Sequence, residues 1–455
     1  MIQPERIQIL RDQPVSAGRY VLYWMQQAQR AACNHALEFA ISEANSRSLP
    51  VVVTFGLTDD YPEANLRHYA FMLQGLADTA QALRQRGIQF VLRRGSPDQV
   101  AVSLSREAAL LVADAGYLRI QRQWRQSVAQ QATCPVLQVE SDVIVPVAVV
   151  SHKEEFAART IRPKIHQSLV RFLTPLSETR PTQSSLGMSF DGLDATRPDA
   201  ILRDLRIDRS VAAVTDYTGG HAAARRLLDR FLTNDLQGYA TRRNEPGLNA
   251  VSHMSPYLHF GQISPLEIAL AVRAAGPSPD ADAYLEELIV RRELSMNFVT
   301  YNESYDRFEC LPQWAIETLH HHAGDKRPYV YSRRELEEAA THDPYWNAAQ
   351  LEMVYTGKMH NYMRMYWGKK ILEWTASPEE AFYTALELNN KYELDGRDAN
   401  SFAGVAWCFG KHDRPWTRRP IFGTVRYMND AGLQRKFDMR AYVRRVEALA
   451  QRGVE

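Results

Sequence analysis

The chain has 455 residues, which is long enough for two domains that each bury a sizeable core. Its hydrophobic content of 45% and charged content of 24% are ordinary for a soluble globular protein, and no apolar stretch is long enough to span a membrane. The net charge of +1 gives no overall attraction to nucleic acid, but basic residues gather late in the chain, where they could form one DNA-binding face.

The first third of the chain alternates short apolar runs with helical patterns. This alternation predicts a doubly wound α/β domain with a parallel sheet over residues 1–173. Neither a GxGxxG fingerprint nor a P-loop follows the first strand, so we place no dinucleotide in this domain. The expected strands are 20–24, 51–55, 88–92, 110–112 and 136–139, and the expected helices are 33–44, 65–86 and 97–105.

Residues 174–216 are rich in turn-forming residues and poor in periodic apolar ones, which predicts an interdomain linker. Beyond the linker the pattern is helical, and residues 217–455 are expected to form one all-α domain. The expected helices there are 221–234, 265–274, 281–298, 332–340, 344–355, 360–373, 378–390 and 440–452.

The four cysteines, Cys33, Cys134, Cys310 and Cys408, are far apart and form no CxxC pair. Their spacing argues against a zinc ribbon or an iron–sulfur cluster, so we expect no metal and a reducing compartment. The first residues lack the apolar run of a signal peptide. We therefore expect a cytoplasmic protein.

The stretch from Thr356 to Trp374 is the most informative part of the chain for function. Asn361 and Arg364 are three residues apart, so on a helix they share one face. Trp367 and Trp374 are seven apart, two turns along. An amide, a guanidinium and a row of indoles on one helix suit a redox cofactor that needs an anion partner and an electron supply.

Met359-His-Asn361, with Arg364-Met365, resembles the flavin-binding signature of the DNA photolyase and cryptochrome family. The surrounding residues resemble its class II cyclobutane pyrimidine dimer photolyases. The resemblance covers nearly the whole chain and is strongest from Tyr239 to Tyr427. It implies an antenna-type α/β domain followed by a helical domain that binds FAD, active in its reduced anionic form, and UV-damaged DNA. A second antenna chromophore, of deazaflavin or folate type, stays open, and we expect a monomer.

Several segments match the flavin site of that family. Hydroxyls of Ser252 and Ser255 near a helix start suit a phosphate, although serines before a proline are commonly helix caps. Asp395 is expected to face Arg364 and hold its guanidinium in a bidentate pose. The residues expected to bind the cofactor are Tyr239, Ser252, His253, Met254, Ser255, Arg291, Asn361, Arg364 and Asp395.

The sequence Glu287-Leu-Ile-Val-Arg-Arg-Glu-Leu294 resembles a family motif in which the glutamate faces the damaged bases. Glu287 is therefore the expected lesion contact, with Val290 where many relatives carry tryptophan. The alternative is an exposed helix with Glu287 and Arg291 as an i,i+4 ion pair. Asn389 matches an asparagine near the flavin ring, although helix C-capping by Asn389 and Asn390 would explain these residues equally well.

Trp346, Trp367 and Trp374 match the electron-relay tryptophans of class II enzymes, whereas buried indoles are more often simple core. Met365 and Trp407 match residues that face the lesion, where a thioether and a flat ring would sandwich a flipped-out dimer. Arg242 matches an arginine that fills the gap left in the duplex. An ordinary phosphate contact is the alternative for Arg242.

The resemblance implies light-dependent repair of cyclobutane pyrimidine dimers by a deoxyribodipyrimidine photo-lyase, with electron transfer from photoexcited reduced FAD to the flipped-out dimer. The main alternative is a cryptochrome-like blue-light photoreceptor. The chain retains all four residues that match lesion contacts, Glu287, Met365, Trp407 and Arg242, and this favours repair over signalling. A light-independent nucleic-acid-binding module is a second alternative, and flavin absorbance of the purified protein discriminates it.

Overall fold

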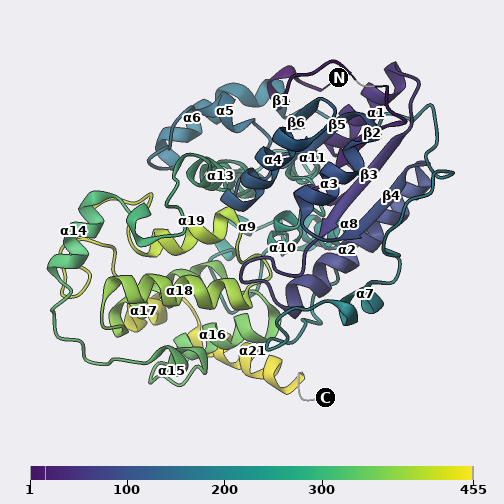
Figure 1. Ribbon diagram of the computed structural model, residues 1–455. Helices are drawn as coiled ribbons and strands as arrows, with labels where there is room; N and C mark the ends of the chain where they lie inside the picture. The colour runs from purple at the N-terminus through teal and green to yellow at the C-terminus, as the bar shows by residue number, and fades with distance from the viewer. Residues whose placement is uncertain (1, 16, 453–455) are drawn as a thin grey trace.

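The computed structural model describes residues 2–15 and 17–452. Figure 1 shows an α/β part that carries the N-terminus, next to a helical part in green and yellow that ends at the C-terminus. The expected combination of an N-terminal α/β sheet domain and a helical C-terminal region is present.

The sheet has six strands in the order β1-β6-β5-β2-β3-β4. Strands β2 to β6 pair in parallel, whereas β1 pairs with β6 antiparallel at the edge. The pattern of apolar runs missed β1 because it is half exposed and carries only Ile7, Ile9 and Leu10 as apolar residues. The strands are β1 (Ile7–Arg11), β2 (Tyr20–Trp24), β3 (Val51–Leu57), β4 (Gln89–Arg94), β5 (Ala108–Asp114) and β6 (Val136–Val139).

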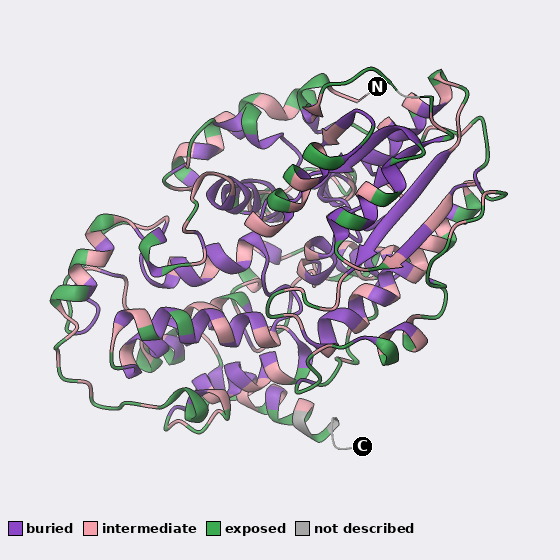
Figure 2. Ribbon diagram, viewed as in Figure 1, coloured by how far each residue is buried: buried purple, intermediate pink, exposed green. Residues whose placement is uncertain are grey.

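Helices cover both faces of this sheet, as in a doubly wound fold. α1 and α2 pack on one face, where Val21, Val53 and Val112 point, and α3 and α4 pack on the other, where Leu22 and Val52 point. Figure 2 shows the central strands as fully buried. The four helices are α1 (His35–Ser46), α2 (Leu66–Gln85), α3 (Pro97–Ser105) and α4 (Arg119–Gln131), of which α4 was not predicted because most of its residues are polar.

The chain between the sheet and the helical part packs in two directions. The helices α5 (Val147–Val150) and α6 (Ala158–Phe172) pack with the central helices of the helical part. The predicted linker returns to the sheet, where Leu193 bridges Leu92 of β4. It also carries α7 (Pro198–Asp204), which packs on α2.

The helical part contains the expected helices and several short ones that no pattern predicted. The expected helix 281–298 is α12, a π-helical segment η2 and α13 in succession. The elements are α8 (His221–Asn234), α9 (Tyr239–Arg242), α10 (Ser255–His259), α11 (Pro265–Ala274), α12 (Pro279–Leu285), η2 (Glu286–Arg291), α13 (Arg292–Tyr301), α14 (Gln313–His321), α15 (Arg333–Glu337), α16 (Pro344–Thr356), α17 (Asn361–Trp374), α18 (Pro378–Tyr392), α19 (Ala399–Cys408), α20 (Asp430–Lys436) and α21 (Met439–Arg452), with 3-10 turns at η1 (Pro4–Arg6) and η3 (Phe308–Cys310).

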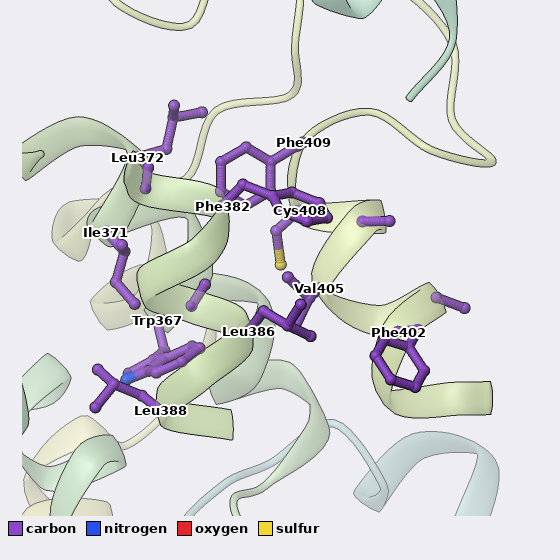
Figure 3. Close-up of a cluster of buried hydrophobic side chains, with 14 of the residues drawn as sticks. Trp367, Ile371, Leu372, Phe382, Leu386, Leu388, Phe402, Val405, Cys408 and Phe409 are labelled. Carbon is purple, nitrogen blue, oxygen red and sulfur yellow. The ribbon is translucent and has the colours of Figure 1, made fainter. Parts of the chain in front are cut away.

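The largest apolar cluster lies where α17, α18 and α19 meet. Figure 3 shows Trp367 of α17 beside Leu388 of α18, with Cys408 and Phe409 closing the cluster from the end of α19. The cluster fixes α17, and so fixes the polar residues at its N-terminal end. Among the described residues, no helix has the length and apolar character needed to cross a membrane.

Candidate functional site

A cavity of about 530 Å³ opens in the helical part, between the segment leading into α10, η2, the start of α17 and α21. Its volume lies in the range of roughly 300–1,000 Å³ that is typical of small-molecule sites. Nine residues selected from the sequence line it together: Tyr239, Ser252, His253, Met254, Ser255, Glu287, Asn361, Arg364 and Asp395.

The start of α17 sets the position of the cavity's central cation. The His360 side chain caps the helix by accepting from the backbone N–H of Tyr362, and Arg364 follows one turn later. Its Nη2 atom lies 3.0 Å from Oε1 of Glu393 and 3.7 Å from Oδ1 of Asp395. The expected pairing with Asp395 alone is therefore incomplete, because Glu393, two residues earlier, is the nearer partner.

Lys358 is a second buried cation of the cavity wall that the sequence did not single out. Its Nζ donates to Oγ of Ser255 at 2.8 Å. Burial would raise the pKa of Asp395, but Arg364 and Lys358 outweigh it and hold that pKa at about 2. The cavity thus contains a carboxylate and two cations within a few residues of the candidate phosphate-binding serines.

Both histidines of the cavity are neutral at pH 7. Burial lowers the pKa of His253 to about 3 and that of His360 to about 4. His253 has a left-handed backbone conformation, with φ at 57°, and its Nδ1 lies 2.7 Å from the hydroxyl of Tyr217. These side chains supply hydrogen-bonding groups to the wall without adding charge.

Glu352 of α16 anchors the C-terminal helix to the cavity. Its carboxylate accepts from the backbone N–H of His360 at 3.1 Å, from the Tyr442 hydroxyl at 2.7 Å and from Arg445 at 2.5 Å. Glu352 and Arg445 line the cavity, yet they are 93 positions apart. No local pattern in the sequence could have paired them.

The π-helical segment corrects one predicted residue. Glu287 points into the cavity and pairs with Arg243 at 2.7 Å, so the i,i+4 pair with Arg291 is wrong. Arg291 is exposed and lies 3.3 Å from Glu286. Arg292 is the buried arginine, and it lines an adjoining hollow of about 190 Å³ that Glu287 also borders. A π-turn contains an extra residue, which rotates the following side chains relative to an α-helix.

Four further predicted residues lie outside the cavity lining. The Arg242 side chain donates to the carbonyls of Asp235 and Gln237, and the adjacent Arg243 lines the cavity in its place. Asn389 lies inside α18 and not at its C-cap. Its buried side chain donates to the hydroxyl of Ser401 on α19. Met365 and Trp407 are half-buried on the neighbouring helices α17 and α19.

The three tryptophans form one buried group. The rings of Trp346 and Trp367 are 6.3 Å apart and 7° from parallel, and Trp346 lies 5.7 Å from Trp374. The indole N–H of Trp346 donates to the Trp367 carbonyl, and that of Trp367 donates to Oε1 of Gln350. Trp346 therefore contacts both other members, an order that the sequence did not reveal.

The atoms around the cavity fit the flavin that the family resemblance implies. Buried polar atoms without a partner among the described residues include the Nε atoms of Arg243, Arg364 and Arg445. Buried donors and acceptors of this kind normally have partners, and a polar ligand would supply them. Two serine hydroxyls, the ammonium of Lys358 and three guanidinium groups suit a diphosphate and an anionic ring.

A second, smaller cavity of about 110 Å³ lies between the two parts of the molecule. It is bordered by the residues after β2, β3 and β5, including Gln27, Thr58 and Tyr117, and by Arg397 and Asp398 of the helical part. Strands β2 and β5 are neighbours from which the chain proceeds in opposite directions. In open α/β sheets, ligands bind at such a switch point.

Comparisons with known proteins agree with this architecture. The family model described as DNA photolyase matches residues 21–182. A deoxyribodipyrimidine photo-lyase from Methanothermobacter thermautotrophicus is 53% identical over 454 residues, covering 99% of each chain. Another from Arabidopsis thaliana is 41% identical over 467 residues, covering 98% of this chain and 94% of its own.

Solved structures with the same fold include a class III photolyase from Agrobacterium tumefaciens, with a TM-score of 0.72 and 17% identity over 95% of this chain and 87% of that chain. A cryptochrome from Synechocystis has a TM-score of 0.71 and 15% identity, over 94% and 86%. At these identities the similarity shows the fold alone.

Proposed function

The chain belongs to the DNA photolyase and cryptochrome family, and from that premise we propose that it is a class II photolyase that repairs cyclobutane pyrimidine dimers. Several relatives at 40–53% identity are named deoxyribodipyrimidine photo-lyase, which favours an enzyme over a photoreceptor. The observation that carries the proposal is one cavity lined both by the Arg364–Asp395 pair and by Glu287.

FAD bound in this cavity would supply, once reduced and excited by light, the electron that splits the cyclobutane ring. Arg364 and Lys358 provide positive charge for an anionic isoalloxazine. Ser252 and Ser255 offer hydroxyls to the diphosphate, and Arg445 offers a guanidinium from α21. These residues stabilise the bound cofactor without taking part in bond cleavage.

Glu287 is proposed to hold the flipped-out dimer, with its carboxylate accepting a hydrogen bond from a ring N–H of the lesion. It borders both the main cavity and the adjoining hollow, and Arg243 holds its carboxylate at 2.7 Å. A guanidinium held in advance where negative charge develops acts by electrostatic stabilisation, and Glu287 keeps Arg243 in that place. Glu287 would therefore serve the dimer while it carries the transferred electron.

DNA contacts are proposed for the faces of α17 and α19 that carry Met365 and Trp407. Trp407 lies between two cations, with Lys369 Nζ 5.7 Å and the Arg426 guanidinium 5.6 Å from its ring centre. Arg426 also lies 5.0 Å from the ring of Trp416, which is 39% exposed. Lys369 is buried and donates to the Cys408 carbonyl, so the Arg426 guanidinium and the rings of Trp407 and Trp416 are the groups that suit phosphates and stacking bases.

The buried tryptophans are proposed to return the flavin to its reduced state in light. Trp367 follows Arg364 by one turn of α17, Trp346 stacks on it and Trp374 follows. Electrons would pass from Trp374 through Trp346 to Trp367. This activation is separate from repair, which returns its electron to the flavin.

An antenna chromophore of deazaflavin or folate type is proposed for the cavity between the two parts. Position supports this assignment, because the cavity lies at the switch point of the sheet. Its volume of about 110 Å³ is below that of a usual ligand site, so side chains such as Trp124 would have to move. Absorbance beyond that of flavin, in protein purified from its own host, tests this assignment.

A repair assay with defined lesions tests the main proposal. The reduced enzyme is mixed with an oligonucleotide containing one thymine dimer, with and without blue light, and the restored thymines are counted. We expect repair of the thymine dimer only in the illuminated reaction. An otherwise identical oligonucleotide with a 6-4 photoproduct should not be repaired. Protein that contains flavin but leaves the dimer intact in light would instead support the photoreceptor.

A further inference from the structure

Behind Arg364, two buried carboxyl groups face the same guanidinium nitrogen, with Nη2 lying 3.0 Å from Oε1 of Glu393 and 3.7 Å from Oδ1 of Asp395. Oε1 of Glu393 accepts from the backbone N–H of Met359 at 3.0 Å and faces Arg364 Nη2 at 3.0 Å. The other oxygen, Oε2, and Oδ1 of Asp395 are buried without a donor among the described residues. One proton between the two groups would supply the missing donor.

The charges around Glu393 and Asp395 favour protonation of one of the two carboxyl groups. Two negative charges beside one guanidinium in a buried site repel each other, which favours a proton on one of the two carboxyl groups. Glu393 is completely buried, and burial raises its pKa, whereas Arg364 and Lys358 keep Asp395 ionised. The proton therefore belongs on Glu393.

Outside the four-group cluster of Arg364, Lys358, Glu393 and Asp395, the buried Arg397 also interacts with Asp395, but its Nη1 atom is directed at the carbonyls of Glu63 and Asn390, at 3.5 and 3.3 Å. His68 of α2 contacts the Glu393 carbonyl through Nε2 at 3.0 Å, and burial keeps its pKa well below the ordinary value, so it is neutral. The remaining titratable or charged groups that interact with Glu393 are Arg67 of α2, Tyr217 before α8 and Tyr442 of α21. Arg67 is occupied by the carbonyls of Met353, Val354 and Tyr392.

We propose that Glu393 and Asp395 share one proton, held on Glu393, which leaves the cluster with one net positive charge toward the cavity. Arg364 and Lys358 contribute two positive charges and Asp395 one negative charge. With both carboxyl groups ionised the cluster would be neutral. The shared proton thus fits the site to a ligand ring with one negative charge.

This inference rests on the proposed function, in which that ring is the anionic reduced isoalloxazine of FAD. An anion next to the cluster holds the shared proton more tightly than a neutral ring does. The proton is lost as the pH rises through the pKa of Glu393, and the preference for the anionic ring then falls. The pKa of Glu393 should therefore be higher with reduced flavin than with oxidised flavin. At a pH between these two pKa values, reduction of the bound flavin should draw in one extra proton.

The experiment compares wild-type holoenzyme with Glu393→Gln, whose amide is permanently neutral and can accept from Met359. The pH slope of the flavin midpoint potential counts the protons taken up per two electrons. We expect a pH window in which the wild type takes up one proton more than Glu393→Gln. The matched control is Glu140→Gln. Burial also raises the pKa of the Glu140 carboxyl group, to about 7, but this group accepts from the backbone N–H of Val147 and does not line the cavity.

Infrared spectroscopy tests the shared proton without relying on the flavin. At neutral pH the wild type should show a protonated-carboxyl stretching band that Glu393→Gln lacks. Asp395→Asn should also remove the band, because Glu393 then faces Arg364 and Lys358 without a competing carboxylate. This second variant keeps the test valid if Glu393→Gln folds poorly.

An unchanged infrared band in both variants, or equal proton counts in the wild type and Glu393→Gln at every pH, would overturn the shared proton. Failure of the proposed function has a different signature. It would appear as loss of light-dependent dimer repair in the wild type, with the infrared band still present.

Discussion

Trp346 and Trp367 stack with their ring centres 6.3 Å apart and their planes 7° from parallel, although they lie on different helices. Both rings are almost completely buried, and each indole N–H has a hydrogen-bond acceptor. The stack begins at Trp367, one turn after Arg364, which lines the cavity. This arrangement connects Trp367, on the helix of Arg364, to Trp374 through the single intermediate ring of Trp346.

Replacing Trp346 by phenylalanine should therefore block light-driven reduction of oxidised FAD. Repair by enzyme that has been reduced chemically should remain nearly intact, because repair uses only the gap between flavin and dimer. The measurements are flavin absorbance under blue light and dimer repair after chemical reduction. Trp314→Phe on α14 is the matched control, since it changes a half-buried indole outside the three-ring group. Equal loss of both activities in Trp346→Phe would make this ring a core residue only.

The sequence predicted the fold wherever burial leaves a periodic pattern. β3 is buried along its whole length and reads as an apolar run, whereas β1 is half exposed and has no such run. The limits of α8 and α11 were predicted to the residue, because an amphipathic pattern or a serine-proline start marks them. The π-turn in η2 leaves no such signal, and Arg291, which the family motif singled out, is exposed there, whereas Arg292 is buried.

The residues of the site could likewise be predicted only where a local pattern marks them. Arg364 and Asp395 were found because short motifs contain them, and both line the cavity. Glu393 and Lys358 adjoin those motifs but gain their importance from neighbours distant in the chain, such as Ser255. Glu352 and Arg445 have no motif at all, and only the packing of α21 on α16 brings them together.

Glu293 should make the stability of the protein depend on pH. Its Oε1 accepts from the backbone N–H groups of Ile144 and Val145, and burial raises its pKa from 4.5 to about 7. A raised carboxyl pKa contributes stability that is fully present below pH 4.5 and is lost as the pH rises through about 7. At about 1.4 kcal/mol for each pKa unit, the loss is up to about 3 kcal/mol.

Glu293→Gln should remove this contribution, because an amide accepts the same hydrogen bonds and does not titrate. The difference in unfolding free energy between wild type and variant, measured from pH 4.5 to 8, should shift in favour of the variant as the pH rises. Glu317→Gln on the exposed face of α14 provides the control and should show no such trend. A constant difference across the range would mean that Glu293 is ionised in the folded protein throughout.

Arg418 tests whether the late basic residues face DNA. It is exposed in the segment after α19, near the cation–aromatic contacts of Trp407 and Trp416. If it contacts a phosphate, Arg418→Ala should weaken binding to damaged and intact DNA alike and reduce the salt dependence by a slope of about one. Arg334→Ala, which removes an exposed arginine paired with Glu338 on α15, is the control. Unchanged affinity at every salt concentration would place the DNA on another face.

Glu287→Gln separates a role in repair from a role in binding the flavin. The carboxylate borders the cavity and is held by Arg243 at 2.7 Å, so the amide preserves shape but loses the charge that Arg243 meets. If Glu287 keeps the dimer and the Arg243 guanidinium in place while the dimer carries the extra electron, the loss should fall on the chemical step. Because that step competes with return of the electron, we expect a severalfold drop in repair per absorbed photon.

Flavin content and light-driven flavin reduction should stay at the wild-type level in Glu287→Gln, because the tryptophans lie on α16 and α17, whereas Glu287 lies on η2. Glu286→Gln is a close control, since the neighbouring carboxylate pairs with Arg162 and Arg291 outside the main cavity. It should repair dimers normally. Full repair yield in Glu287→Gln would remove Glu287 from the lesion site, and loss of flavin would assign it to the cofactor instead.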